Sequence, residues 1–199
     1  MFLADQGEKA LTVVDPTVSM AKFDRQVGQW REHAREHQRR GIFLIEAAFP
    51  KVFAVFTIPQ IAPAMVAFGA ELDFTNYDLW PPSVRVLNPF TRASFTPQTL
   101  PVIVRARLDP VQGPVADPVV MFQDNGEGEA FMCMPGVREY HNHPAHSGDS
   151  WLSHRNTGAG TLFEILDKLH EFGVKPINGY RVGIQIAGFT MAIPGMPNG

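Results

Sequence analysis

Hydrophobic residues recur at three- and four-residue spacing between positions 17 and 40, and this spacing predicts an amphipathic helix. Phe23, Val27 and Trp30 form its apolar face, and Gly41 follows as a residue type that commonly ends helices. The opposite face carries the charged run REHAREHQRR. That run fits a solvated helix surface and also a docking surface for a partner, so both interpretations stay open.

A second stretch of helical spacing, residues 156–173, is the clearest helix in the sequence. Thr157 or Thr161 offers a cap at its start, and Gly173 stands at its end. One apolar stripe runs along it, formed by Leu162, Ile165, Leu166, Leu169 and Phe172.

Between the two helices the pattern changes to short apolar or alternating stretches, which predict strands. These stretches are residues 41–49, 51–58, 64–79, 83–87, 100–108, 117–122 and 130–134, with a further strand expected at 181–193. The order is a helix, an antiparallel meander of about four or more strands, a Cys/His-rich loop and a second helix. It favours an α+β fold over alternating βαβ units.

Length, composition and charge indicate which broad class of protein this is. The chain has 199 residues, 45% of them hydrophobic, which fits one domain over 1–199 with loose ends at 1–16 and 194–199. A net charge of −3 gives no footprint for nucleic acid or a membrane surface. The chain has neither a secretory pattern nor an apolar run of roughly 20 residues, and its single cysteine excludes an internal disulfide. We therefore expect a cytoplasmic protein.

The chemistry concentrates in residues 131–155, which hold the only cysteine and four of the seven histidines. Glu139, His141 and His143 stand at alternate positions, so they share one face if this segment is extended. With Cys133 they supply a thiolate, a carboxylate and two imidazoles, a reasonable four-coordinate zinc set. The spacing is not that of a zinc finger.

The same residues admit two other interpretations. Cys133 fits a nucleophile assisted by histidine, and the stretch also fits a structural polar loop. His146 and His154 are further candidates, and Asp149 stands between them. A Ser/His/Asp hydrolase built from Ser147 and its neighbours is disfavoured, because those three groups must converge from separate parts of a fold.

Residues 71–89, ELDFTNYDLWPPSVRVLNP, resemble the strand, double-proline, strand segment of ubiquitin-conjugating enzymes. In that family an aromatic-rich strand runs into Pro-Pro-x-Val and a further strand, and here those residues are Pro81, Pro82 and Val84.

The resemblance continues downstream and covers about residues 17–172 in order. NGEGEAFMC resembles the polar turn that leads to the family's active cysteine, with Asn125 eight residues before Cys133, the spacing of the catalytic asparagine. Trp151 and the helix after it are similar to the tryptophan and helix that follow that cysteine. The chain departs from the family in having Gln123 and Asp124 where the family has His-Pro. The connection from Val84 to Asn125 and the segment from Cys133 to Trp151 are also longer than in the family.

The resemblance implies a ubiquitin-conjugating-like fold and a transferase. Cys133 would accept a ubiquitin-like protein as a thioester and pass it to an amine, assisted by Asn125, His141 and His143, and this transfer needs no cofactor. The second implied partner is an activating-enzyme-like protein, which the family meets through the basic face of its first helix. Here that face carries Arg31, Arg35 and Arg39.

Within the superfamily, the pattern Cys-x5-Glu-x-His resembles a bacterial group that is predicted to bind metal and occurs beside ubiquitin-like and activating-enzyme-like proteins. Carried over, its ligands are Cys133, Glu139, His141 and either His143 or His146. A closed zinc site would mask the sulfur, so the alternative is a non-catalytic structural or adaptor protein of the same pathway. A hydrolase of another type is the third class.

Overall fold

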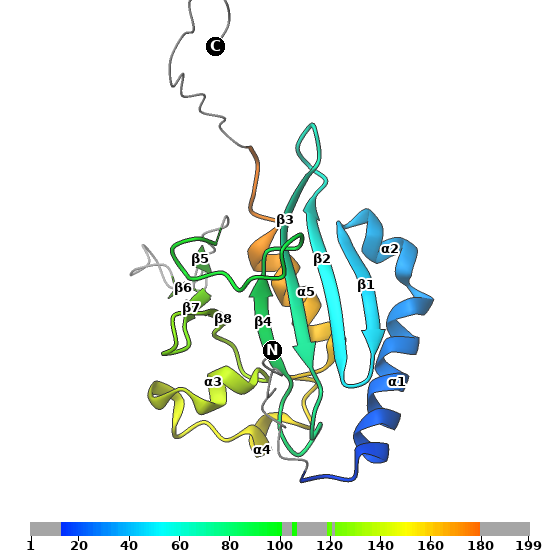
Figure 1. Ribbon diagram of the computed structural model, residues 1–199, viewed down its shortest axis with the longest axis vertical. Helices are drawn as coiled ribbons and strands as arrows, with labels where there is room; N and C mark the ends of the chain where they lie inside the picture. Colours follow the sequence, from blue (N-terminus) through cyan, green and yellow to red (C-terminus); the bar gives the residue numbers. More distant parts are fainter. Residues whose placement is uncertain (1–12, 101–104, 107–118, 121, 180–199) are drawn as a thin grey trace, which may run out of the picture.

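The computed structural model describes residues 13–100, 105–106, 119–120 and 122–179, and Figure 1 shows how their elements are arranged. A four-stranded sheet stands at the centre, with α5 behind it and α1 and α2 along its β1 edge. In chain order the elements are α1 (Pro16–Glu32), α2 (Ala34–Arg39), β1 (Ile42–Ala48), β2 (Lys51–Ile58), β3 (Met65–Asp73), β4 (Ser83–Leu87), β5 (Arg105–Ala106), β6 (Val119–Val120), β7 (Phe122–Asp124), β8 (Ala130–Met132), α3 (Arg138–Asn142), η2 (Pro144–His146), α4 (Trp151–His154) and α5 (Leu162–Gly173). The expected α+β class is confirmed.

The helix predicted over residues 17–40 is divided into α1 and α2 at His33, whose φ of −107° and ψ of 17° leave the helical range. Asp15 caps α1, because its carboxylate accepts a hydrogen bond from the backbone N–H of Thr17 at 2.9 Å. Gly41, with φ +88°, follows α2 as predicted. A Cβ there would lie 2.5 Å from the carbonyl oxygen of Thr57, so the position needs glycine on two counts.

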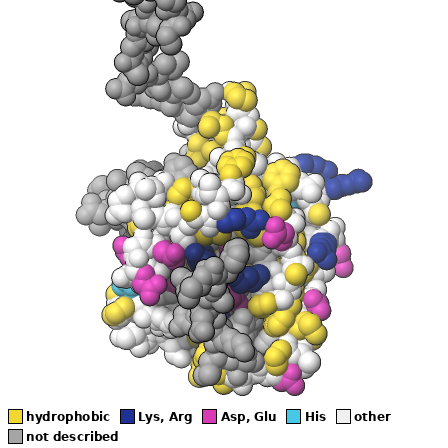
Figure 2. Space-filling model, in the orientation of Figure 1, with side chains coloured by type: hydrophobic (Ala, Val, Ile, Leu, Met, Phe, Trp, Pro, Cys, Tyr) yellow, Lys and Arg dark blue, Asp and Glu magenta, His cyan; other side chains and the backbone are white. Residues whose placement is uncertain are grey.

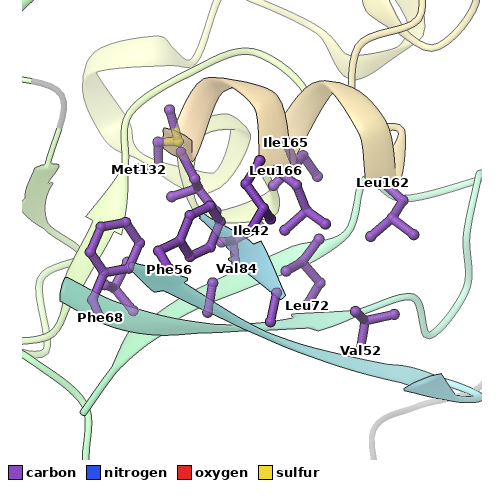
Figure 3. Packing of buried hydrophobic residues seen from close by; sticks show 14 of the residues in the cluster. Ile42, Val52, Phe56, Phe68, Leu72, Val84, Met132, Leu162, Ile165 and Leu166 are labelled. Carbon is purple, nitrogen blue, oxygen red and sulfur yellow. The ribbon is translucent and has the colours of Figure 1, made fainter. Parts of the chain in front are cut away.

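Strands β1 to β4 form an antiparallel meander in which each strand pairs with the next along the chain. The register sets Ile42 opposite Phe56, Phe56 opposite Phe68, and Leu72 opposite Val84. Each of these five side chains is at most 1% exposed. Alternate residues of a strand point to the same face, so the strands build one continuous apolar surface (Figure 3).

Helix α5 covers that surface with the apolar stripe that the sequence predicts. Leu162, Ile165, Leu166 and Leu169 are at most 1% exposed, and Figure 3 shows the first three pointing to the sheet. Phe172 is half-buried at the margin of the core. Burial of such aliphatic side chains, each contributing about 1.5–3 kcal/mol, is the main force that holds α5 on the sheet.

Figure 2 shows one face of the molecule, on which basic and acidic side chains are intermixed. Ion pairs also join residues of the strands and of the loops near them. They are Lys51–Glu71 at 3.0 Å, Arg85–Glu129 at 3.3 Å and Arg92–Glu46 at 2.7 Å. Within the described residues, no helix combines the length and apolar character that crossing a bilayer requires.

A short hairpin, β7 with β8, leads the chain from the sheet to the Cys/His-rich segment. Asp124 pairs with Ala130 and Phe122 with Met132, and residues 125–129 form the polar turn that the sequence predicts. Of the strands expected at 100–108 and 117–122, the structure shows β5, β6 and the start of β7. Leu100 is described and belongs to no strand, while the other positions of those two stretches, the strand expected at 181–193 and most of the expected loose ends lie outside the described residues.

The condition under which Glu139, His141 and His143 would share one face, an extended segment, is not met. Arg138 to Asn142 form α3, which is followed by η2 and α4. The first residue of α3 is anchored to the double-proline segment, because the backbone N–H of Arg138 donates to Pro82 O at 2.9 Å and its guanidinium donates to Pro81 O and Thr75 O. Neighbouring residues in a helix point to different sides, so this anchor separates the side chains that an extended chain would have aligned.

Candidate functional site

Cys133 and His146 come together just beyond the end of β8. Cys133 follows the last residue of that strand, and His146 is the last residue of η2. The Cys133 Sγ lies 3.3 Å from His146 Nε2, and both side chains are half-buried. A thiol and an imidazole at hydrogen-bond distance form the pair of groups that nucleophilic cysteine chemistry requires.

Burial raises the pKa of the Cys133 thiol above its ordinary value. At neutral pH the sulfur is therefore protonated and depends on a base for conversion to the nucleophilic thiolate. His146 Nε2 is placed to take that proton, and the thiol donates toward this nitrogen when it is unprotonated.

Tyr140 positions the imidazole of His146. The two rings are stacked with centroids 3.9 Å apart and planes inclined by 20°. The Tyr140 hydroxyl donates to Asp149 Oδ2 at 2.7 Å, and the other oxygen of that carboxylate bonds His154 Nε2. Burial and the bond to Asp149 raise the pKa of Tyr140 to about 12, so the hydroxyl keeps its proton and the contact persists over the physiological range. The sequence predictions missed Tyr140, although an aromatic residue six positions before a candidate base was a usable signal.

Asp149 and His154, two of the predicted candidates, lie together at the outer end of this cluster. Hydrogen bonds from His154 and then Tyr140 lower the pKa of Asp149, which keeps its carboxylate ionised. From the sulfur outward, the contacts run from Cys133 to His146, Tyr140, Asp149 and His154.

His141 bonds backbone groups of the loop around this cluster, whereas His146 is the histidine beside the thiol. Its Nδ1 lies 2.8 Å from the carbonyl oxygen of Asp149, and its Nε2 accepts a hydrogen bond from the backbone N–H of Gly136 at 3.1 Å. A carbonyl only accepts, so Nδ1 carries the proton and the ring is neutral. Both nitrogens are used, and in this conformation His141 has no lone pair free for a metal ion or a substrate proton.

Glu139 points toward the sheet. Its carboxylate accepts hydrogen bonds from the Ser83 hydroxyl and, at 3.0 Å, from the backbone N–H of Val84, which ties α3 to the start of β4. Burial raises the pKa of Glu139. Among the described residues, no group of three or more Cys, His, Asp and Glu side chains is arranged to hold a metal ion. The zinc interpretation stays a prediction, and it would require Glu139 and His141 to leave these partners.

His143 and Asn125 serve local turns. His143 Nδ1 accepts a hydrogen bond from the backbone N–H of Ala145 at 3.2 Å, and its ring lies 5.6 Å from that of His146. Asn125 Oδ1 accepts from two backbone N–H groups of the β7–β8 turn, at 2.8 and 3.2 Å. The three residues of β8 separate this end of the hairpin from Cys133, so the four steps from Glu129 to Cys133 span about 13 Å in an extended chain. The asparagine predicted to assist the cysteine therefore lies at the opposite end of the hairpin.

Trp151 fixes the loop to the segment before the double proline. Its indole N–H donates to the carbonyl oxygen of Asp78 at 3.0 Å, and its ring packs edge-on against His141 with centroids 5.8 Å apart. Trp151 and His141 also line an open cleft of about 540 Å³, whose lining includes Leu79, Trp80, Leu152 and Arg138.

The fold and this loop define an α+β protein that carries a cysteine–histidine pair at the end of a hairpin. A family model, "Y4jH-like: Y4jH family", matches residues 14–177, a range that includes the whole cluster. The chain is 39% identical over 196 residues to a protein of Sinorhizobium fredii (strain NBRC 101917 / NGR234) that bears the name "Uncharacterized protein y4jH". The match covers 92% of this chain and 96% of that protein. The chain belongs to the Y4jH-like family.

Proposed function

We propose that this protein is a cysteine-dependent transferase of the ubiquitin-conjugating type, in which Cys133 carries the C-terminus of a ubiquitin-like protein. The observation that supports this most directly is the 3.3 Å approach of Cys133 Sγ to His146 Nε2. The order of the sequence motifs supplies the substrate class, because the double proline, the polar turn, the cysteine and Trp151 follow one another as in that family.

In this reaction His146 first accepts the proton of the Cys133 thiol. The thiolate attacks the thioester carbonyl of the ubiquitin-like protein on its activating enzyme. A new sulfur–carbon bond forms, and the activating enzyme's own thiolate departs and takes up the proton that His146 holds, which returns His146 to its neutral form. An acceptor amine then attacks the carbonyl of the Cys133 thioester and the carbon–sulfur bond breaks, while His146 takes the amine's extra proton and passes it to the departing Cys133 sulfur. The products are an amide and the free thiol.

The proposal assigns the base to His146, where the sequence favoured His141 and His143. His141 spends both nitrogens on backbone partners, and His143 accepts a backbone hydrogen bond through Nδ1. Asn125 is likewise engaged by its own turn, so we propose no contact between it and the reacting carbonyl in this conformation.

The first helical segment offers a surface for the activating partner. Arg31 lies in the last turn of α1, Arg35 and Arg39 lie on α2, and all three residues are exposed. Only Arg39 has an ion pair among the described residues, with Glu36 at 2.7 Å. Exposed cations of this kind speed association with an acidic partner and contribute little to folding.

A transfer assay that needs no activating enzyme tests the proposal. Ubiquitin and bacterial ubiquitin-like proteins, each carrying a C-terminal mercaptoethanesulfonate thioester, are incubated with the full chain. Wild type should form an adduct that a thiol reductant removes, Cys133→Ala should form none, and His146→Ala should form it at least about tenfold more slowly. His33→Ala, which changes an exposed histidine outside the cluster, is the matched control and should behave as wild type.

Two outcomes would count against transfer. Absence of adduct with every protein tested, while iodoacetamide still alkylates Cys133, would show that the thiol is accessible but does not accept the tail. Rapid release of the free acid without an acceptor amine, lost in Cys133→Ala, would identify a thiol hydrolase instead.

A further inference from the structure

A second cleft, separate from the cysteine–histidine pair, lies between α1, α2, the segment after α4 and the start of α5. Its volume is about 770 Å³, which falls in the range of small-molecule pockets. Neither Cys133 nor His146 lines it, and the proposed transfer reaction does not use it.

The positive and negative charges that line the cleft are unequal in number. Lys22, Arg25 and Arg155 line it together with two carboxylates, Glu32 and Asp78, so with neutral histidines one positive charge is in excess. Lys22 is paired with Asp78. Within the part of the chain that the structure describes, Arg25 and Arg155 have no ion pair.

Two lining side chains have unmet hydrogen-bonding capacity. The Nε of Arg155 is buried and finds no acceptor among the described residues. His37 is only 4% exposed, and neither of its ring nitrogens has a partner in that same part of the chain. Buried polar atoms in proteins are satisfied in the large majority of cases, so two such side chains at one cleft indicate an absent partner.

Part of the lining of the cleft is aromatic. Trp30 and His37 are stacked with centroids 3.5 Å apart, and Phe163 lies 6.0 Å from each ring. Phe163 is 54% exposed, although it belongs to the same helix as the buried stripe of α5. It also lies in the first turn of that 12-residue helix, where the positive end of the helix dipole favours an anion.

We infer that this cleft binds a small molecule in which a phosphate monoester is joined to a flat ring. The phosphate would lie between Arg25 and Arg155, whose guanidinium groups donate to phosphate oxygens. The ring would lie against the exposed face of Phe163. The excess charge and the unpaired Arg155 Nε select an anion, while the aromatic wall and the large volume select a ligand bigger than inorganic phosphate.

Isothermal titration calorimetry on the full chain tests this with three probes: AMP, adenosine and inorganic phosphate. AMP carries both groups, and each of the others carries one. AMP should bind at least about tenfold more tightly than either, because the two contacts add. Arg25→Gln and Arg155→Gln should each weaken AMP binding about tenfold, the size of a lost charge-assisted hydrogen bond. Arg39→Gln removes an exposed arginine that does not line the cleft, and it should leave AMP binding unchanged.

Each contrary result overturns the inference. If phosphate binds as tightly as AMP, the ring makes no contact. If adenosine binds as tightly as AMP, the phosphate makes no contact. If no probe binds, the cleft is not a binding site for such ligands. Equal weakening by Arg39→Gln and Arg25→Gln would show a diffuse effect of charge. Arg25 is exposed on α1, so Arg25→Gln should fold. It keeps the test valid even if circular dichroism shows that Arg155→Gln does not fold.

Discussion

The properties of the site at the scale of single residues follow from what each side chain contacts. Cys133 is half-buried, which favours its neutral form, and only an adjacent base makes it reactive at neutral pH. In the proposed reaction His146 supplies that base, and the ring of Tyr140 is stacked on its imidazole. Reactivity therefore depends on the pair rather than on the cysteine alone.

We predict that the pH dependence of Cys133 alkylation by iodoacetamide distinguishes wild type from His146→Ala. Without the imidazole, the rate should stay low at pH 7 and rise only as the thiol titrates, above its ordinary pKa. Wild type should react about tenfold faster at pH 7, because the base accepts the thiol proton. His143→Ala, which removes a neighbouring imidazole, should keep the wild-type profile, and coincident profiles for wild type and His146→Ala would contradict the assignment.

The raised thiol pKa also has a consequence for stability. The folded state holds this proton more tightly than the unfolded state, so the contribution of the neutral thiol is complete below the unfolded pKa. It is lost as pH rises through the folded pKa. Tyr140 acts in the same direction between pH 10 and about 12. Both groups favour the folded state at neutral pH and cease to do so in strong alkali.

At the scale of elements, α5 and the sheet carry the stability while the short helices carry the site. The buried stripe of α5 repeats at helical spacing and meets alternate residues of the strands, so both elements present continuous apolar surfaces. α3, η2 and α4 lack such stripes. They are held instead by anchors such as Arg138 to the double proline and Glu139 to the start of β4.

We predict that Leu166→Ala lowers the free energy of unfolding by about 2–5 kcal/mol, because Leu166 is 0% exposed and its removal leaves a cavity between α5 and the sheet. Urea unfolding followed by circular dichroism measures the change. Leu152→Ala makes the same chemical change at a position that is 64% exposed, and it should cost no more than about 0.5 kcal/mol. Similar losses in the two variants would show that α5 is not packed as described.

At the scale of the whole molecule, the two clefts and the cysteine–histidine pair occupy different places around one core. The pair follows the hairpin, the smaller cleft is lined by Trp151 and its neighbours, and the larger cleft is lined by residues of α1, α2 and the start of α5. Trp151 belongs to the smaller cleft and bonds Asp78, which lines the larger one, so this contact joins the two regions. A partner on one of them need not cover the others.

We predict that protein purified without a histidine tag carries well under one zinc per chain, and that a chelator leaves its melting temperature unchanged. The reason is that Glu139 and His141, two of the four implied ligands, are engaged by Val84, Ser83, Gly136 and Asp149. Elemental analysis and differential scanning calorimetry measure both quantities. About one zinc per chain, lost in Cys133→Ala or His141→Ala, would favour the adaptor alternative over the transferase.

Periodicity in the sequence by itself determined the frame of this protein: the stripe of α5, the apolar face of α1, the strands of the central sheet and the polar turn before Cys133. Such patterns are readable because an element must turn its apolar residues to one side to bury them. Every member of the cysteine cluster also lies within residues 131–155, the stretch in which the sequence concentrates its chemistry. The sequence did not show which of four histidines meets the thiol, because residues 137–146 lack a periodic pattern and could be extended or helical.

Tertiary structure decided that choice. The anchoring of Arg138 and Glu139 to residues 81–84 makes α3 a helix, which turns Glu139 toward the sheet and His141 toward Gly136, and leaves His146 beside the sulfur. The large cleft arises in the same way, since it is lined by α1 and α2 and also by the start of α5, which lies more than a hundred residues further along the chain. Contacts between distant segments leave no local signature, and for that reason only the folded chain reveals them.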